Sequence, residues 1–115
     1  MKDMRQRNII LVPFPFSDQS GQKVRPALIL SNDKYNSTSD DVLVCAVTTN
    51  IKPSEYTVLI GQNDLESGVL YEKSAIKAES LLKIQKSLIL KTIATVNMQT
   101  LTRATDAIKE LLSPA

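Results

Sequence analysis

The chain has 115 residues, of which 43% are hydrophobic and 23% are charged, and its formal net charge is +2. This length suits one domain, residues 1–115, and is too short for two. No apolar run is long enough to cross a membrane, and the short run near the start lacks a cleavage signal, so we expect a cytoplasmic protein. Because histidine is absent, imidazole catalysis, cysteine–histidine proteolysis and ordinary zinc sites are excluded within this chain.

The single cysteine, Cys45, lies in an apolar stretch and has no partner for an internal disulfide. We interpret it as a buried, inert thiol. The sequence therefore predicts neither a metal site nor a cofactor, and any chemistry must use Arg, Lys, Asp, Glu, Ser, Thr or Tyr. The small positive charge is compatible with nucleic-acid binding but does not argue for it.

The first half of the chain contains two predicted strands. Residues 9–12 are β-rich and are followed by prolines at positions 13 and 15, so the first strand should end there. Residues 17–23 are polar and predict a loop. Residues 26–31 predict a second strand that is buried on both faces, with Arg25 at its entrance, held extended by Pro26.

The middle of the chain continues the strand pattern. Residues 32–41 are polar and leave room for a helical turn, and residues 42–48 predict a third strand. Alternation places Val42, Val44, Ala46 and Thr48 on one face of that strand. A fourth strand is predicted at residues 56–60, and a polar loop at residues 62–68.

The last part of the chain ends in a helix. Strands are predicted within residues 69–78, at 81–84 and at 91–96, and Asn97 then provides a helix N-cap. The apolar stripe of this helix comprises Met98, Leu101, Ala104, Ile108, Leu111 and Leu112. Five to seven short strands followed by one amphipathic helix predict a mainly β fold, a small barrel with a helix docked on it. Periodicity alone does not distinguish a barrel from an open sheet.

Several motifs resemble the MazF/PemK family. They are the run IILVPFPFSD at residues 9–18 with the glycine at position 21, the run RPALILS at 25–31, the run VTT at 47–49, and the pair SG at 67–68 followed by SAIKA at 74–78. The resemblance extends from about residue 7 to the C-terminal helix. It implies an SH3-like β-barrel with a C-terminal α-helix, usually assembled as a homodimer.

The family resemblance also implies a function. Most members are toxins of toxin–antitoxin pairs that cut single-stranded RNA at short sequences without a metal ion, and an acidic tail of the antitoxin fills the RNA groove. The residues that recur in the proposed chemistry correspond to Arg25 and Thr48 in this sequence. Many members carry Gly-Asp or Gly-Glu before the first strand, where this chain has Arg7 and Asn8.

One branch of the family, the Kid-like toxins, uses a histidine in the first loop and an arginine and aspartate on a late strand. This chain has no histidine, and Lys77 and Glu79 stand at the late-strand positions. A lysine does not provide the planar, bidentate fork of an arginine. The mechanism that uses Arg25 and Thr48 therefore fits this sequence better.

The chemistry can also be derived from the residues. RNA is cut when its 2′-hydroxyl attacks the adjacent phosphorus, and an enzyme must orient that hydroxyl and stabilise charge on the phosphoryl oxygens. Arg25 can donate two parallel N–H bonds, and Thr48 can donate one or orient the nucleophile. Neither is a suitable general base. Glu79, predicted to share a strand face with Lys77, is the candidate base; the alternative is catalysis by orientation and electrostatics alone.

Further residues are candidates for substrate binding. Phe16 can stack on a base, and Ser17 and Gly21 belong to a loop that can gate the RNA groove. Lys23, Lys52 and Lys77 can follow the phosphates. The other aromatic side chains available for stacking are Phe14, Tyr56 and Tyr71. Thr49 takes the place of Thr48 if the strand register shifts by one residue.

The candidate residues can also have structural roles, and the fold is compatible with other functions. Arg25 can pair with a carboxylate that closes the barrel end, Thr48 can serve as a strand former, and Lys77 with Glu79 can form a surface ion pair. The same fold also serves CcdB, a toxin that binds DNA gyrase and cleaves nothing. A third alternative is an inactive homologue that only binds an antitoxin.

Overall fold

The computed structural model describes residues 4–14 and 23–114. Within these residues the chain forms seven strands, two α-helices and two short 3-10 helices. In chain order these are β1 (Asn8–Phe14), β2 (Lys23–Ile29), α1 (Asp33–Thr38), β3 (Asp41–Thr48), β4 (Thr57–Ile60), η1 (Gln62–Asp64), β5 (Leu65–Gly68), β6 (Ser74–Gln85), η2 (Lys86–Leu88), β7 (Lys91–Val96) and α2 (Met98–Leu112).

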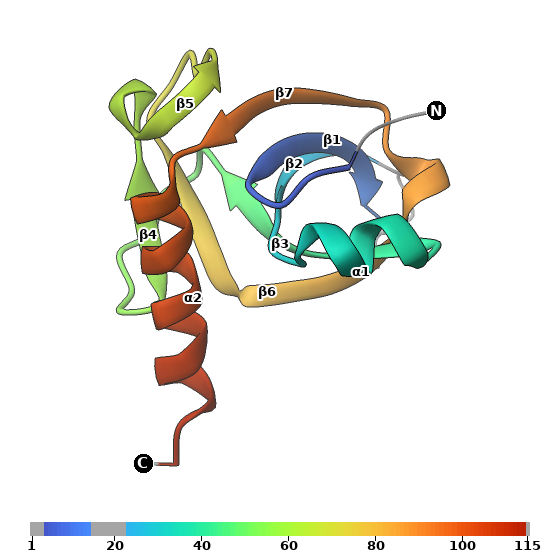
Figure 1. Ribbon diagram of the computed structural model, residues 1–115. Coiled ribbons are helices and arrows are strands. Elements are labelled where there is room, and N and C mark those ends of the chain that lie inside the picture. Colours follow the sequence, from blue (N-terminus) through green and yellow to red (C-terminus); the bar gives the residue numbers. More distant parts are fainter. Residues whose placement is uncertain (1–3, 15–22, 115) are drawn as a thin grey trace.

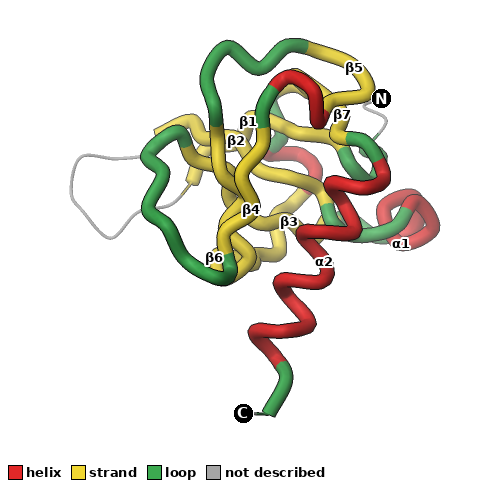
Figure 2. The backbone as a smooth tube through the Cα atoms, turned by 90° about the vertical axis from the view of Figure 1, so that its left-hand side faces the viewer, coloured by secondary structure: helices red, strands yellow, loops and turns green. Residues whose placement is uncertain are grey.

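All seven described strands belong to one antiparallel sheet with the order β4-β6-β3-β2-β1-β7-β5. The sheet curls into a half-barrel, with β7 arching over the strands β1 to β3 (Figure 1). Helix α2 runs beside β4 and β6, and α1 lies at the other side of the molecule (Figures 1 and 2). The predicted mainly β fold with a C-terminal helix is confirmed.

The core consists of two apolar clusters, one on each face of the sheet. The strand β3 contributes to both: Val42 and Val44 join one cluster, and Cys45 and Val47 the other. This is the predicted alternation, and it follows from the period of two along a strand. The first cluster also contains Ala27 and Ile29 of β2 and the partly buried Ala46 of β3. By the same alternation, Arg25 of β2 and Thr48 of β3 come next on this face, beyond the last pair Ala27↔Ala46.

The first strand is longer than predicted. We expected it to end before Pro13, but β1 continues to Phe14 and stays paired with β2 up to Phe14↔Lys23. Pairing with β7 stops at Leu11, so the end of β1 is an edge on that side. Leu11 accepts from the N–H of Leu90 on that side, and Pro13 faces the same way two residues later. A proline is tolerated there because none of the described strands pairs with the end of β1 on that side and needs the missing N–H.

Two predictions for the second half of the chain were wrong. The loop predicted at residues 62–68 contains η1 and the strand β5, which pairs with β7 at the sheet edge. The two short strands predicted within residues 69–78 and at 81–84 are one continuous strand, β6, of 12 residues. The ladder between β3 and β6 jumps from Cys45↔Leu81 to Ala46↔Lys77, so residues 78–80 form a bulge within β6.

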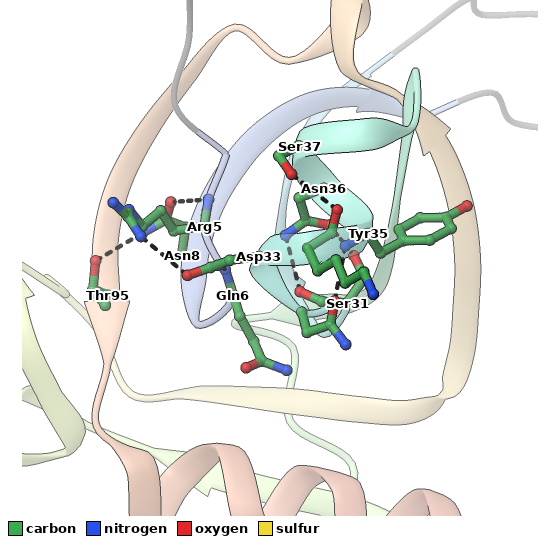
Figure 3. Close-up of polar contacts among 11 residues, drawn as sticks. Arg5, Gln6, Asn8, Ser31, Asp33, Tyr35, Asn36, Ser37 and Thr95 are labelled. Atoms are coloured by element: carbon green, nitrogen blue, oxygen red, sulfur yellow. Dashed lines mark hydrogen bonds and ion pairs between the residues drawn. The ribbon is translucent and has the colours of Figure 1, made fainter.

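The segment before β1 is fastened to α1. Arg5 forms an ion pair with Asp33 at 3.0 Å, and the backbone N–H of Gln6 donates to the same carboxylate at 2.8 Å (Figure 3). The hydrogen bond from Gln6, followed by the interaction with Arg5, lowers the pKa of Asp33 below its usual value. Arg7, at the position where many family members have glycine, has a left-handed φ of 81°. Its guanidinium reaches Glu66 at 2.8 Å and the carbonyl of Val96 at 3.0 Å.

Helix α2 begins as predicted. The side chain of Asn97 accepts from the backbone N–H of Thr100 at 2.9 Å, as an N-cap does. Of the predicted apolar stripe, only Leu101 and Ala104 are buried, whereas Met98 and Leu112 are 58% and 72% exposed. The helix packs through its first turns, and its C-terminal part extends beyond the strands (Figure 2).

Candidate functional site

The candidate site begins where β2 and β3 separate. Their last pair is Ala27↔Ala46. At the other end of this pairing, the backbone N–H of Leu30 donates to the carbonyl of Leu43. The backbone polar groups of alternate residues point toward the same neighbouring strand, so the backbone of Pro26 also faces β3. Because Pro26 has no N–H, it cannot continue the ladder. The two strands therefore separate at Pro26.

A cavity of about 460 Å³ lies at this separation. Ala46 lines this cavity. Four predicted site residues line the same cavity: Arg25 from β2, Thr48 from β3, and Lys77 and Glu79 from β6. Arg25 is exposed and Thr48 is half-buried. The remaining lining residues are Ala46, Val47, Asn50, Ser80, Leu81 and Leu82.

The hydroxyl of Thr48 is held by its own loop. Its Oγ1 accepts from the backbone N–H of Asn50 at 3.0 Å, which closes a short turn after β3. A hydroxyl that accepts one hydrogen bond keeps its own hydrogen for donation. Within the described part of the chain, that hydrogen has no acceptor. Thr48 is therefore a hydrogen-bond donor available to a ligand in the cavity.

Lys77 and Glu79 reach the same cavity by way of the bulge in β6. Lys77 pairs with Ala46 on one side and with Thr57 of β4 on the other, so it is fixed in the sheet. Glu79 lies in the bulge, outside the ladder. We predicted that the two residues share one strand face by alternation, and the buried Ala78 between them fits this pattern. Both residues line one cavity.

A second cavity of about 230 Å³ adjoins the first. Both cavities are lined by Thr48, Asn50, Lys77 and Glu79. The lining that belongs to the smaller cavity alone consists of Lys52, Pro53, Ser54, Thr57 and Ala75. The loop between β3 and β4 thus forms one wall of the site.

The other substrate-binding candidates lie elsewhere. Thr49 lines a different cavity of about 560 Å³, together with Pro26, Val47 and the exposed Tyr71. Consecutive residues of a strand point to opposite faces, which explains why Thr48 and Thr49 are separated. Lys23 is exposed at the start of β2. Phe16, Ser17 and Gly21 lie outside the described residues.

Sequence reasoning missed Asn50 and Ser80, which line the main cavity. Ser80 lies in the bulge of β6, and neither the alternation nor the composition of that segment marks a bulge. Asn50 follows Thr48 at the distance typical of a turn closed by a threonine hydroxyl, and this signal is visible in the sequence.

Cys45 is buried, as predicted, and burial raises the pKa of its thiol to about 12. In residues 4–14 and 23–114, no three cysteine or carboxylate side chains lie close enough to form a metal site. No helix of these described segments is both long and apolar enough to span a membrane.

Comparison with known proteins gives one family and many similar folds. Residues 5–112 match the PemK-like, MazF-like toxins of type II toxin–antitoxin systems. No curated protein matches the sequence significantly.

Three solved structures illustrate the similarity of the fold. A mycobacterial endoribonuclease in complex with its cognate antitoxin has 18% identity and a TM-score of 0.77, covering 97% of this chain and 98% of that one. The MazF-mt6 toxin of Mycobacterium tuberculosis has 19% identity and a TM-score of 0.74, covering 90% and 94%. A MazE–MazF structure from Deinococcus radiodurans has 19% identity and a TM-score of 0.79, covering 100% of both chains. At such identities the likeness shows the fold alone.

Proposed function

Because the chain belongs to the PemK-like, MazF-like toxin family of type II toxin–antitoxin systems, we propose that it is a cytoplasmic endoribonuclease. It cleaves single-stranded RNA at a short sequence, without a metal ion, through attack of a 2′-hydroxyl on the adjacent phosphorus. One observation carries this proposal: Arg25 and Thr48 line a single cavity with Lys77 and Glu79. A cation, a hydroxyl donor and a carboxylate are the groups that such a reaction needs.

Each group has a defined part in the proposed reaction. The guanidinium of Arg25 donates to the phosphoryl oxygens and stabilises the charge that develops on them. Thr48 adds a second donor, because its own hydrogen is left available. Glu79 accepts the proton of the 2′-hydroxyl.

The 2′-oxygen forms a bond to phosphorus, the bond from phosphorus to the 5′-oxygen breaks, and that oxygen takes a proton from Lys77 or water. The products are a 2′,3′-cyclic phosphate and a free 5′-hydroxyl.

The proposed partners follow from the same site. A cationic cavity that binds RNA phosphates also suits an acidic segment of an antitoxin, and similar folds occur in structures of a toxin with its antitoxin. We propose that the protein acts as a homodimer, as is usual in the family, and that antitoxin binding blocks access of RNA to Arg25.

Cleavage of a long, mixed-sequence single-stranded RNA in the presence of EDTA tests the function. We expect discrete fragments that end in cyclic phosphate. Arg25→Ala should lower the rate by at least about 100-fold, as loss of a donor to a developing oxyanion does. Arg103→Ala is the matched control, because Arg103 lies on α2 and contacts Leu59 and Asp64, away from both cavities.

The outcomes separate the proposal from its rivals. If Arg25→Ala cuts RNA as fast as the unchanged protein, the site assignment is wrong. If the unchanged protein leaves RNA intact, the nuclease function is wrong. Inhibition of DNA supercoiling by gyrase would then favour the CcdB-like function, and binding of antitoxin without either activity would favour an inactive homologue.

A further inference from the structure

The smaller cavity of about 230 Å³ shares a wall with the cavity that contains Arg25. We propose that it is a recognition pocket for one nucleobase beside the cleaved phosphate, and that Asn50 reads the hydrogen-bonding edge of this base. This inference rests on the proposed RNA-cleaving function and adds the residue that selects the sequence. It makes Asn50 a specificity-determining residue rather than a catalytic one.

The position of the pocket supports this assignment. It shares Thr48, Asn50, Lys77 and Glu79 with the larger cavity that contains Arg25. A nucleotide whose phosphate lies against Arg25 can therefore place its neighbouring base in the smaller cavity without leaving the site. Asn50 lines both spaces, at the point where phosphate and base would meet.

The size of the pocket suits a base. A volume of 230 Å³ corresponds to about eight water molecules at their share of liquid volume. Covalently bonded atoms lie closer together than separate water molecules, so a single base takes up less space than this and fits inside the pocket. The larger cavity is left for the ribose and the phosphate.

The lining favours hydrogen bonding over stacking. No aromatic side chain lines the pocket in the described part of the chain. The Oγ of Ser54 accepts from the backbone N–H of Tyr56 at 3.1 Å, so this hydroxyl, like that of Thr48, keeps its hydrogen for donation. The side-chain amide of Asn50 can donate and accept. Such a set fits a base edge that presents a ring carbonyl beside an N–H, as uracil and guanine do.

The loop that carries Asn50 is held at both ends, which a selective pocket requires. At its start, the N–H of Asn50 donates to Thr48 at 3.0 Å. At its end, the N–H of Thr57 donates to the carbonyl of Ser54 at 3.2 Å, and the N–H of Ala78 donates to the carbonyl of Tyr56 at 3.1 Å. The loop is thus fixed to β6 before RNA arrives, so that little ordering is needed on binding.

The test compares Asn50→Ala with Asn63→Ala, an exposed asparagine of η1 that lines neither of the two cavities of the site. Each protein is incubated with a mixed-sequence single-stranded RNA, and all cleavage ends are mapped by sequencing. We expect Asn50→Ala to reduce the preference for one base next to the cut by about 10- to 100-fold, the range for one base-edge contact. Preferences at other positions should remain, and Asn63→Ala should behave like the unchanged protein.

Two results would contradict the proposed base-recognition pocket without contradicting the nuclease function. One is that Asn50→Ala cleaves RNA with an unchanged base preference at every position. The other is that Asn50→Ala lowers the cleavage rate equally at every cleavage site. If the unchanged protein does not cut RNA, binding of fluorescent single-stranded dA, dC, dG and dT homopolymers decides the question. Tighter binding of dT or dG that Asn50→Ala removes would support the pocket, and equal binding of all four would contradict it.

Discussion

Arg25 and Thr48 occupy facing positions on β2 and β3, two residues beyond the last pair of these strands, Ala27↔Ala46, and both line the same cavity. The separation of the strands makes room for a ligand between the two side chains. Pro26 accounts for the separation, since it removes the donor that would continue the ladder. The fold thus creates the candidate site at the first position where β2 and β3 cannot pair.

Pro26→Ala should lower the activity of the site, because alanine restores the backbone N–H that proline lacks. Alanine can donate to β3, so the ladder can extend and narrow the cavity. We expect RNA cleavage to fall by about tenfold, while the free energy of unfolding changes by less than about 1 kcal/mol. Rates of cleavage and urea unfolding curves measure the two effects. An unchanged rate in a well-folded variant would show that Pro26 does not keep the cavity open.

Thr48→Val keeps the shape and strand preference of the side chain but removes its hydroxyl. We expect the cleavage rate to fall by about 100-fold, the usual loss for one donor to a developing oxyanion. Thr48→Ser should retain cleavage, because it keeps the donor. Thr49→Val is the matched control, since Thr49 lines the other cavity. Equal rates for Thr48→Val and Thr49→Val would exclude the proposed role of the hydroxyl.

The salt dependence of RNA binding should report on Lys77. Each phosphate contact on single-stranded nucleic acid contributes about 0.7 to the slope of log affinity against log salt concentration. Lys77→Ala should therefore reduce this slope by about 0.7. Lys34→Ala, an exposed lysine of α1, should leave the slope unchanged. Fluorescence anisotropy over a series of salt concentrations measures both slopes. Equal slopes for the two variants would show that Lys77 does not contact the phosphates.

Cys45 should make the protein less stable at high pH. Burial raises its pKa from the ordinary thiol value of 9.0 to about 12 in the folded chain, so between these pH values the unfolded chain loses a proton that the folded chain keeps. The free energy of unfolding should fall by about 1.4 kcal/mol per pH unit in this range from this group alone. Cys45→Ala should show a shallower decline than the unchanged protein. A thiol reagent should modify Cys45 only after unfolding, and rapid modification of the native protein would contradict its burial.

Asn36 holds the connection between β2 and α1. Its side-chain amide donates to the carbonyl of Ser31 at 2.9 Å and accepts from the Ser31 hydroxyl, and the residue is 2% exposed (Figure 3). Asn36→Ala leaves buried polar groups without partners, so we expect a loss of about 1–3 kcal/mol in unfolding free energy. Ser37→Ala, on the exposed side of α1, should change it by less than about 0.5 kcal/mol. Urea unfolding of both variants provides the measurement, and equal stabilities would contradict the role of Asn36.

Much of this fold could be predicted from the sequence because local patterns determine it. The alternation along β3 identified the two faces correctly, and Asn97 marked the start of α2. Pro13 misled the prediction because a proline is excluded only where a partner strand needs its N–H, and strand order is not visible locally. The helical stripe was overestimated for a similar reason, since periodicity identifies an apolar face but not how far a neighbour covers it.

The candidate site was predictable in part. Arg25 and Thr48 were identified through their motifs, and the structure brings them together with Lys77 and Glu79. Their roles in catalysis remain predictions. The sequence shows the spacing of a turn closed by the Thr48 hydroxyl, but the cavity that Asn50 lines depends on how β3, β4 and β6 come together.

The bulge of β6 has a consequence for how this protein can diversify. Residues 78–80 leave the ladder between Cys45↔Leu81 and Ala46↔Lys77, so the pairing on either side does not depend on them. Ala78 is buried and its N–H donates to the carbonyl of Tyr56, whereas Glu79 is exposed, so substitutions of Glu79 can change the wall of the cavity while the ladder stays in register. One exposed position can therefore vary the chemistry of this wall without any change to the scaffold that supports it.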